Sequence, residues 1–502
     1  MPLDVCLIKL PTVLAPKSVS YFGTVLPLGL AYVAAAARAG GHRVAVVDAP
    51  GAAMDRFAPW PTDVGELVLH GLGPEELAAG ISPETRVVGI GHMFLHEWPL
   101  LRETVRAVRA ARPGVILVVG GENATGMWER ILDEAPEVDA CVLGEGEATF
   151  VALLNALERG EALHGVTGLA LRGADGRPFS TGRAQRLRSL DALSRPAWDL
   201  FPVEAYLDAG CGSGVDRGRT MPMVTSRGCP FRCTFCSAPL MWTTRYEARS
   251  PDDVADEVAA LQARYGVTNI DFCDLTAVLT KAWILDLCAV IERRGLRFTW
   301  QLPSGTRSEA IDAEAARALR ASGCHNFGYA PESGSPRMLK RVNKKVALDR
   351  LEQSVADALT AGLTVHANFI VGFPDETWED VAATLRFLAR LALLGMHSVS
   401  VMTFSPYPGS EDYARLQSQI MFDDEYIYGS LFRSGGRARS YNPSIGSSEL
   451  LAAQAAAFAT FFGVQFARRP GRAVALLSNL ARGRQETALD KFVSAKLAQL
   501  RR

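Results

Sequence analysis

Short apolar runs alternate with helical patterns over residues 1–155. The runs are rich in Val and Ile and lack polar alternation, which is typical of parallel strands buried on both faces. Strands are expected at Val5–Leu10, Val44–Asp48, Val87–Gly91, Val115–Val119 and Ala140–Leu143. The intervening helices are expected at Leu28–Ala39, Pro99–Ala111, Ala124–Ala135 and Glu147–Glu158. This order predicts an α/β domain with a doubly wound, flavodoxin- or Rossmann-like sheet, whose ligand binds at the carboxyl ends of the strands.

A second α/β pattern runs from about residue 216 to residue 415. Six strands are expected at Met223–Ser226, Asn269–Cys273, Arg297–Gln301, Asn326–Ala330, Thr364–Val371 and Ser398–Phe404. Helices are expected at Trp283–Arg293, Ala313–Ala321, Leu348–Ala361 and Thr377–Leu393. The segment Ser250-Pro-Asp-Asp253 has the N-cap residue, proline and early carboxylates of a further helix start. The pattern predicts a partial (β/α)6 TIM-like barrel with its active face at the C-terminal strand ends.

The two patterns divide the chain into residues 1–160, a connector at 161–215, the barrel at 216–415 and a helical C-terminal region at 416–502. In the connector, the Asp175-Gly176 turn predicts a small hairpin. The last region contains a helical pattern rich in Ala and Phe at Glu449–Phe466, followed by a basic stretch with only Glu486 and Asp490 as acids. Such a stretch can lie on an anionic membrane surface, or it can be a solvated helical face that caps the barrel mouth.

Composition and charge narrow the possible partners and compartments. The 502 residues carry a net charge of −1, so no overall charge points to nucleic acid as a partner. Nine cysteines, scattered apart from one group of three, do not form a disulfide framework and suit a reducing, cytoplasmic compartment. The N-terminus lacks the pattern of a signal peptide, and we find no apolar span of 18 residues that would predict a transmembrane helix.

Three of the cysteines, Cys229, Cys233 and Cys236, lie in one short loop after the first predicted barrel strand. Their close spacing lets the thiolates converge on one soft metal centre at little entropic cost. Iron–sulfur clusters usually have four cysteine ligands, so a cluster held by three leaves one iron open to a small molecule. A zinc site is the alternative, but it needs a fourth Cys or His, and none lies between Gly228 and Leu240.

The spacing of these cysteines, with Phe235 just before the last, resembles the cluster loop of the radical S-adenosylmethionine (SAM) enzymes. The resemblance implies a [4Fe-4S] cluster whose open iron binds SAM, and an electron donor such as flavodoxin or ferredoxin. It also implies SAM contacts at two later strand ends. Glu332 and Ser333 match the pair that meets the ribose and methionyl groups, and Asn368 and Gly372 match the segment that packs on the adenine.

Upstream of this loop, a Pro-Leu-Gly-Leu segment, a Gly-Gly-Glu-Asn turn and a Gly-Glu-Gly-Glu turn resemble the cobalamin-binding domain of class B radical SAM enzymes. Glycines at strand ends can be ordinary turn residues, but they also let a backbone approach a flat ligand closely. The resemblance implies cobalamin contacts at Leu26, Gly29, Gly91, His92, Gly120, Gly121, Glu122, Gly144, Glu145 and Gly146. The Asp-x-His-x-x-Gly motif that supplies an axial histidine in other cobalamin proteins is absent, so the resemblance implies a cobalt that needs no protein histidine.

Polar residues at two further strand ends of the barrel are candidates for contact with substrate. Asp274 follows the second predicted strand, and Tyr407 follows the sixth. Either could handle a proton in the reaction. Either could also be an ordinary polar residue whose hydrogen bonds are satisfied within the fold.

The resemblance implies a cobalamin-dependent radical SAM enzyme, most often a methyltransferase acting on an unactivated carbon of a hydrophobic or natural-product substrate. SAM would serve both as methyl donor to the cobalt and as the source of a 5′-deoxyadenosyl radical. A small molecule or a lipid is the expected substrate. Two alternatives remain open: a cyclase-like, ring-forming or oxidative enzyme without methyl transfer, and a cobalamin-binding sensor or carrier with a vestigial cluster.

Overall fold

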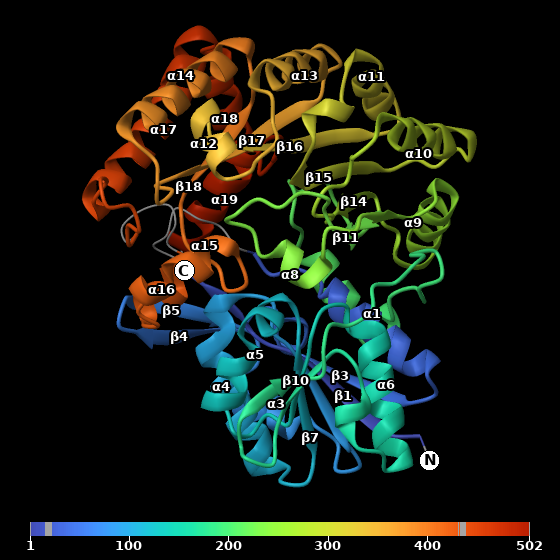
Figure 1. Cartoon of the computed structure of the whole chain (residues 1–502). Coiled ribbons are helices and arrows are strands. Elements are labelled where there is room, and N and C mark those ends of the chain that lie inside the picture. Colours follow the sequence, from blue (N-terminus) through green and yellow to red (C-terminus); the bar gives the residue numbers. More distant parts are fainter. Residues whose placement is uncertain (1, 16–22, 430, 432–437, 501–502) are drawn as a thin grey trace.

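The computed structural model describes residues 2–15, 23–429, 431 and 438–500. Its first sheet has seven strands in the order β10-β9-β8-β7-β6-β1-β3. Five of them are parallel and match the expected strands: β1 (Asp4–Lys9), β3 (Arg43–Asp48), β6 (Val87–Gly91), β7 (Ile116–Gly120) and β8 (Ala140–Val142). Helices α1 (Leu28–Ala39) and α6 (Gly146–Arg159) cover one face, and α4 (Trp98–Ala111) and α5 (Glu122–Glu134) cover the other (Figure 1). The doubly wound sheet is confirmed.

The first half also contains elements that the apolar pattern did not predict. A three-stranded antiparallel sheet is formed by β2 (Thr12–Leu14), β5 (Gly65–His70) and β4 (Phe57–Thr62). Two prolines in β4, Pro59 and Pro61, hid it, because proline is common only in edge strands. Short helices α2 (Ala49–Ala52) and α3 (Pro74–Ala79) lie in the same part of the chain. The predicted hairpin is present as β9 (Leu169–Arg172) and β10 (Pro178–Ser180).

The second sheet is open and entirely parallel, in the order β11-β14-β15-β16-β17-β18, as the partial barrel requires. Its strands are β11 (Thr220–Met223), β14 (Asn269–Phe272), β15 (Thr299–Thr306), β16 (Cys324–Glu332), β17 (Thr364–Val371) and β18 (Ser398–Thr403). The helices are α7 (Val203–Asp208), α9 (Pro251–Tyr265), α10 (Lys281–Arg293), α11 (Ala313–Ala321), α12 (Pro336–Arg341), α13 (Leu348–Thr360) and α14 (Trp378–Leu394). The Ser250 hydroxyl caps α9 by accepting from Asp253 N, as predicted. The first strand, however, ends at Met223, before the predicted Ser226.

The C-terminal helices are α15 (Glu411–Leu416), α16 (Asp424–Gly429), α17 (Ser447–Arg468), α18 (Gly471–Ala481) and α19 (Ala488–Leu500). Of these, α17 and α19 lie at the two edges of this barrel, and α16 packs on the first half of the chain, where Tyr428 accepts from Trp60. α17 lies along the edge strand β18, where Gln454 Nε2 donates to Val401 O at 2.7 Å. α19 reaches the other edge, where Lys491 Nζ donates to Gly212 O at 2.7 Å, shortly before β11. α17 is long and apolar enough to cross a membrane, by length and composition, which corrects the expectation that no such span exists.

Candidate active site

The cysteine loop begins at a two-stranded sheet of β12 (Ser226–Arg227) and β13 (Glu247–Ala248). Gly228 has a φ of +87°, and a Cβ there would lie 2.1 Å from Arg245 O, so only glycine fits. The thiols of Cys229, Cys233 and Cys236 are free and half-buried. Burial raises the pKa of Cys236 to about 12, so a bound metal is needed to hold this sulfur as a thiolate.

A cavity of about 340 Å³ opens beside this loop. Cys233 and Cys236 line it, together with Arg183, Thr243 and Gly409. Nowhere in the described ranges are three or more His, Cys, Asp or Glu side chains placed to hold a single metal ion. In a cubane each thiolate binds a different iron, so the sulfurs stand further apart than around one ion. Three soft donors on a loop beside a cavity therefore fit a [4Fe-4S] cluster.

Asp274 supports the base of the loop. Its Oδ1 accepts hydrogen bonds from Thr225 N at 2.9 Å, Thr225 Oγ1 at 2.9 Å and Ser226 Oγ at 2.6 Å. The side chain is only 1% exposed. Burial raises the pKa of Asp274, while the hydrogen bonds from Ser226 and Thr225 oppose that rise. The carboxylate is thus enclosed by the backbone and hydroxyls of the segment that leads into the cysteines, and a substrate-facing role for Asp274 stays a prediction.

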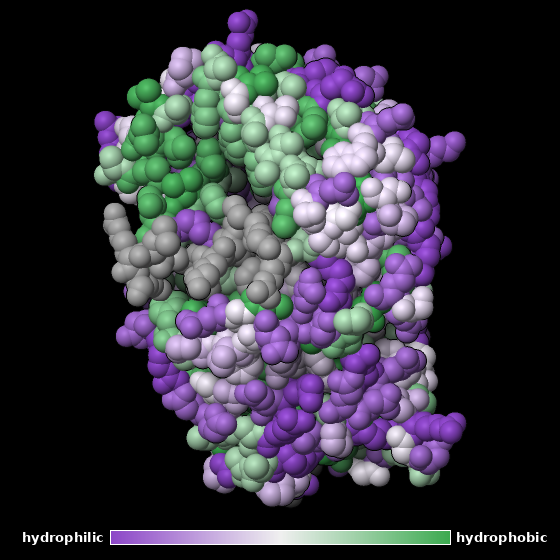
Figure 2. Space-filling view, turned by 90° about the vertical axis from the view of Figure 1, so that its left-hand side faces the viewer, coloured by the Kyte–Doolittle hydropathy of each residue, from purple (hydrophilic) through white to green (hydrophobic). Residues whose placement is uncertain are grey.

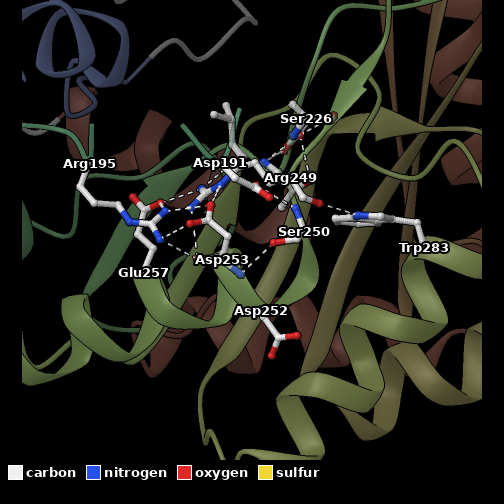
Figure 3. Close-up of polar contacts among 12 residues, drawn as sticks. Asp191, Arg195, Ser226, Arg249, Ser250, Asp252, Asp253, Glu257 and Trp283 are labelled. Atoms are coloured by element: carbon white, nitrogen blue, oxygen red, sulfur yellow. Dashed lines mark hydrogen bonds and ion pairs between the residues drawn. The ribbon is translucent and has the colours of Figure 1, made fainter. Parts of the chain in front are cut away.

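Arg249 also holds this segment, and Figure 3 shows it among Arg195, Asp253 and Glu257. Its guanidinium donates to Val224 O at 2.9 Å and pairs with Asp253 and Glu257, each at 2.6 Å. Arg195 of the connector joins both carboxylates, and its contact with Glu257 is 3.2 Å. Arg249 and Glu257 are each 3% exposed. The cluster loop is thus tied to α9 and to the connector by a buried ionic network.

The residues expected to meet the ribose and methionyl groups of SAM separate into two environments. Glu332 ends β16 with a φ of +69° and pairs with Lys344, with 3.0 Å between Oε1 and Nζ. Burial lowers the pKa of Lys344, but Glu332 and Cys233 outweigh it and raise this pKa overall. Ser333 is fully buried, and its Oγ lies 3.2 Å from Thr384 Oγ1. Ser333 is thus hydrogen-bonded inside the fold, Glu332 lies in the electrostatic environment of Cys233, and the contact of both residues with SAM stays a prediction.

The predicted adenine segment includes the last part of β17, with Asn368, and the turn that follows it, with Gly372. Gly372 has a φ of +86°, and its N–H donates to the buried carboxylate of Glu376. Asn368 Oδ1 lies 3.0 Å from His366 Nε2. Phe235 of the cysteine loop packs on Phe373, with ring centroids 5.6 Å apart. The structure therefore brings the segment after β17 against the cysteine loop.

The carboxyl edge of the first sheet meets the cysteine loop through α8 (Ala238–Trp242). Glu122 Oε1 accepts from Ser237 Oγ at 2.7 Å, and a Cβ on Gly144 would lie 3.5 Å from Met241 O. Glu145 pairs with Arg186 at 2.8 Å and with Arg227 at 3.2 Å, two residues before Cys229. The Glu145 carboxylate is 2% exposed and forms an ion pair between the two halves of the chain, and its cofactor contact stays a prediction.

The other residues expected at the cobalamin differ in how open their surroundings are. His92 is 0% exposed, its Nε2 lies 3.0 Å from Asn123 Nδ2, and burial lowers its pKa to about 3. Leu26 is 4% exposed and packs in the core. Both side chains are buried, and their contact with cobalamin stays a prediction. An added Cβ would meet nothing within 4 Å at Gly29, and its nearest atom at Gly91 would be 3.8 Å away.

The remaining glycines are placed as follows. A Cβ on Gly121 would lie 2.5 Å from His92 O, so this position needs glycine to form the turn. A Cβ on Gly120 would lie 3.6 Å from Val142, and a Cβ on Gly146 would lie 3.4 Å from Val33, both ordinary van der Waals contacts. The open backbone at Gly29 and Gly91, at the carboxyl edge of the sheet, fits the close approach of a flat corrin.

Tyr407 lies in the loop after β18 and is half-buried, and its carbonyl accepts from Ser410 N at 3.0 Å. The same loop touches both halves of the chain. Pro408 O would lie 2.9 Å from a Cβ on Gly126 of α5, and Gly409 lines the cavity at the cysteines. The loop thus lies at the interface, and a catalytic role for Tyr407 stays a prediction.

Sequence patterns did not single out Arg227, Arg186, Arg249 or Lys344. Each of these cations pairs with a carboxylate that lies at least four residues away in the chain, and for Arg227 and Glu145 the separation is 82 residues. The nearest sequence signal is the position of Arg227 between Ser226 and Gly228, directly before the cysteines. Pairings over such separations follow from the fold and not from local pattern.

Two family profiles match the chain. The B12 binding domain matches residues 18–154, and the Radical SAM superfamily matches residues 223–388. An uncharacterized methyltransferase from Pyrococcus horikoshii is 31% identical over 76% of this chain and 77% of its own. Cytidylyl-2-hydroxyethylphosphonate methyltransferase from Streptomyces wedmorensis is 28% identical over 82% of this chain and 81% of its own. Anaerobic magnesium-protoporphyrin IX monomethyl ester cyclase from Rubrivivax gelatinosus is 27% identical over 64% of this chain and 57% of its own.

A solved structure has the same fold. The radical SAM methyltransferase TsrM from Kitasatospora setae, with cobalamin and a [4Fe-4S] cluster bound, superposes with a TM-score of 0.64 at 20% identity, over 84% of this chain and 75% of its own. The fold and site thus define a B12-binding domain joined to a radical SAM barrel. The chain belongs to the cobalamin-dependent radical SAM methyltransferases. Its cofactors are a [4Fe-4S] cluster, SAM and cobalamin.

Proposed function

We propose that the chain transfers a methyl group from SAM to an unactivated carbon of a small molecule, at the interface between the two α/β sheets. The observation that carries this proposal is the position of the cysteine loop: Cys233 and Cys236 line a cavity, and Ser237 and Arg227 at the two ends of the loop contact Glu122 and Glu145 at the carboxyl edge of the first sheet. Methyl transfer through two cofactors needs both of them next to the same substrate. The Glu122–Ser237 contact and the Arg227–Glu145 pair keep the two cofactor-binding surfaces together.

In this mechanism the protein positions groups and excludes water. When bound, the reduced cluster and SAM would supply a radical that removes a hydrogen atom from the substrate carbon, and cobalamin would carry the methyl group that is transferred. Asp274 and Arg249 hold the segment that leads into Cys229. Cys229, Cys233 and Cys236 bind iron, Glu332 with Lys344 binds the polar end of SAM, and Asn368 with Gly372 borders its adenine. Phe235, Gly29, Gly91, Gly120, Gly121, Gly144 and Gly146 complete the cofactor surfaces in this proposal.

The substrate is a small molecule, and its class belongs to the proposal. A hydrophobic or natural-product substrate is expected, with its reacting carbon in the cavity beside Cys233 and Cys236. The one-electron reductant is an external protein such as flavodoxin or ferredoxin. All nine cysteines are free, which suits work in the reducing cytoplasm.

Ring formation without methyl transfer is the second candidate, since a cyclase matches part of the chain. The two methyltransferase relatives match 76% and 82% of this chain, however, whereas the cyclase matches 64%. The wider match includes more of the chain outside the shared domains and favours methyl transfer. A sensor or carrier with a vestigial cluster is disfavoured, because the three thiols are free and lie in a shaped loop.

The test is an anaerobic incubation of reconstituted protein with SAM and a strong reductant, with cobalamin present or omitted. We expect S-adenosylhomocysteine to form only with cobalamin, and 5′-deoxyadenosine to form whenever the reductant is present. Both products together support two uses of SAM and hence methyl transfer. If 5′-deoxyadenosine forms alone, the ring-forming or oxidative assignment replaces this one.

A further inference from the structure

Helix α17 is apolar on its exposed side as well as on most of its buried side, and its buried side includes two glutamines. Its buried Gln454 and Gln465 donate to backbone oxygens at or next to the edge strand β18: Gln454 to Val401 O at 2.7 Å, and Gln465 to Met396 O at 2.6 Å. Between Glu449 and Arg468 the helix has no charged residue. Between these two residues its exposed positions are Ala452, Ala455, Ala456, Ala459, Gly463 and Ala467. A helix at a water-facing surface normally has charged and polar residues on its exposed face.

The neighbouring elements extend this apolar surface. Helix α18 has no buried residue, and its Val474 and Leu477 are 66% and 68% exposed. At the end of α14, Leu393 and Leu394 are 53% and 40% exposed. We call this surface, formed by α17, α18 and the end of α14, the α17–α18 face. Figure 2, which views the side where α17 lies in Figure 1, shows hydrophobic residues gathered over the upper part of the molecule.

The same face is rich in positive charge. Residues 450–485 contain five arginines and no Asp or Glu. Arg469 and Arg472 donate to backbone oxygens at the end of α14, namely Ala392 O at 3.0 Å and Met396 O at 2.6 Å, and so keep their net charge. Arg468, Arg482 and Arg484 are exposed, and none of the five forms an ion pair within the described part of the chain. An apolar surface with cations at its border matches the chemistry of an anionic lipid bilayer.

We propose that the α17–α18 face docks the protein on the surface of an anionic lipid bilayer. α17 would lie along the surface and not across it, because its two glutamines bind the barrel edge and Leu450 and Phe461 pack in the core. The basic segment from α18 onward contributes charge through Arg482 and Arg484, whereas Lys491 is engaged with the barrel. The inference does not rest on the reaction, because docking involves none of the residues at the cysteines.

The test is flotation of the full-length protein with lipid vesicles of phosphatidylcholine alone or with 30% phosphatidylglycerol. We expect binding to the anionic vesicles and much weaker binding to the neutral ones. The double variant Val474→Ser/Leu477→Ser should reduce binding to anionic vesicles at least tenfold, since both side chains are exposed and their loss does not disturb the core. Arg482→Gln/Arg484→Gln should reduce it about tenfold and weaken its dependence on salt.

Phe179→Ser is the matched control, because Phe179 is an exposed apolar residue of β10, in the first sheet. This substitution should leave vesicle binding unchanged. The proposal fails if wild-type protein floats with neither kind of vesicle, or if the Val474/Leu477 variant binds as well as wild type. It also fails if sedimentation velocity shows a wild-type dimer that this variant converts to monomer, because a second copy of the chain would then cover the face.

Discussion

Arg249 is a buried cation that pairs with the half-buried Asp253 and the buried Glu257. Replacing it by methionine keeps most of the volume but leaves the Glu257 carboxylate with Arg195 alone, at 3.2 Å. Loss of one member of a buried ionic network costs about 3–5 kcal/mol. We expect Arg249→Met to lower the free energy of unfolding by this amount, measured by urea denaturation followed by circular dichroism.

Arg293→Met is the control for this variant, because Arg293 pairs with Asp252 at 3.5 Å and both side chains are more than 60% exposed. An exposed pair contributes about 0–1 kcal/mol. If the two variants lose similar stability, the buried network does not support the cysteine loop in the way described.

The buried Glu376 should make the free energy of unfolding depend on pH. Burial raises its pKa from 4.5 to about 7, helped by Asp380 and opposed by the Gly372 N–H. Between about pH 4.5 and 7 the folded protein binds more protons at this site than the unfolded chain does, so stability falls as pH rises through this window. Glu376→Gln should remove about 2–3 kcal/mol of this decrease. Urea midpoints at pH 5 and pH 8 measure the change.

The neighbouring variant Glu379→Gln is the matched control, since Glu379 is exposed at the start of α14. It should keep the pH dependence of the wild type. Equal pH dependence in wild type and Glu376→Gln would contradict a buried, protonated Glu376.

At this scale the sequence identified residues whose chemistry is local. The three cysteines are close in the chain, and Ser250 caps the helix that it directly precedes. Asp274 and Glu145 lie at the predicted strand ends, but their partners within the fold were not foreseen. Their carboxylates are occupied by Ser226 and Arg227, which lie 48 and 82 residues away. Only the fold decides such contacts, so their roles could not be predicted.

At the scale of elements, the short sheet of β12 and β13 sets the direction of the cysteine loop. Gly228→Ala would place a Cβ 2.1 Å from Arg245 O and push the two strands apart. We expect the iron content after anaerobic reconstitution to fall at least twofold, measured per chain by colorimetric assay. The loop, and not the whole fold, should bear most of the effect.

The variant Gly41→Ala is the control, because it introduces backbone strain like that of Gly228→Ala but no steric clash. Gly41 has a similar φ of +91°, but a Cβ there would meet nothing within 4 Å. Its strain should cost about 1–2 kcal/mol and leave the iron content unchanged. Iron content that is normal in Gly228→Ala, or equally reduced in both variants, would contradict the role given to Gly228.

Elements with a strong period were predicted closely, and irregular ones were not. α1, α11 and β17 have the predicted bounds, because their apolar residues follow one clear period. β4 was missed because its prolines break the strand pattern. The apolar run of α17 was seen as a helix, but its buried glutamines and its membrane-crossing length were not foreseen.

At the scale of the whole molecule, the two α/β sheets form one site. Arg227 is 6% exposed and pairs with Glu145 and Glu147 of the first half, so the cysteine loop and the first sheet cannot separate without exposing a buried ion pair. The order of the two domains could be predicted from the motifs. Their mutual placement could not, because it depends on contacts between segments about 80 residues apart.

The measurement that tests the account most directly compares wild type with the variant Cys229→Ala/Cys233→Ala/Cys236→Ala. Iron, bound cobalamin and 5′-deoxyadenosine formation are determined on the same anaerobic samples. We predict that the variant loses iron and SAM cleavage but keeps cobalamin, because the first sheet does not need the cluster to fold. Retained SAM cleavage in the variant would contradict the assignment of the cluster to these three cysteines.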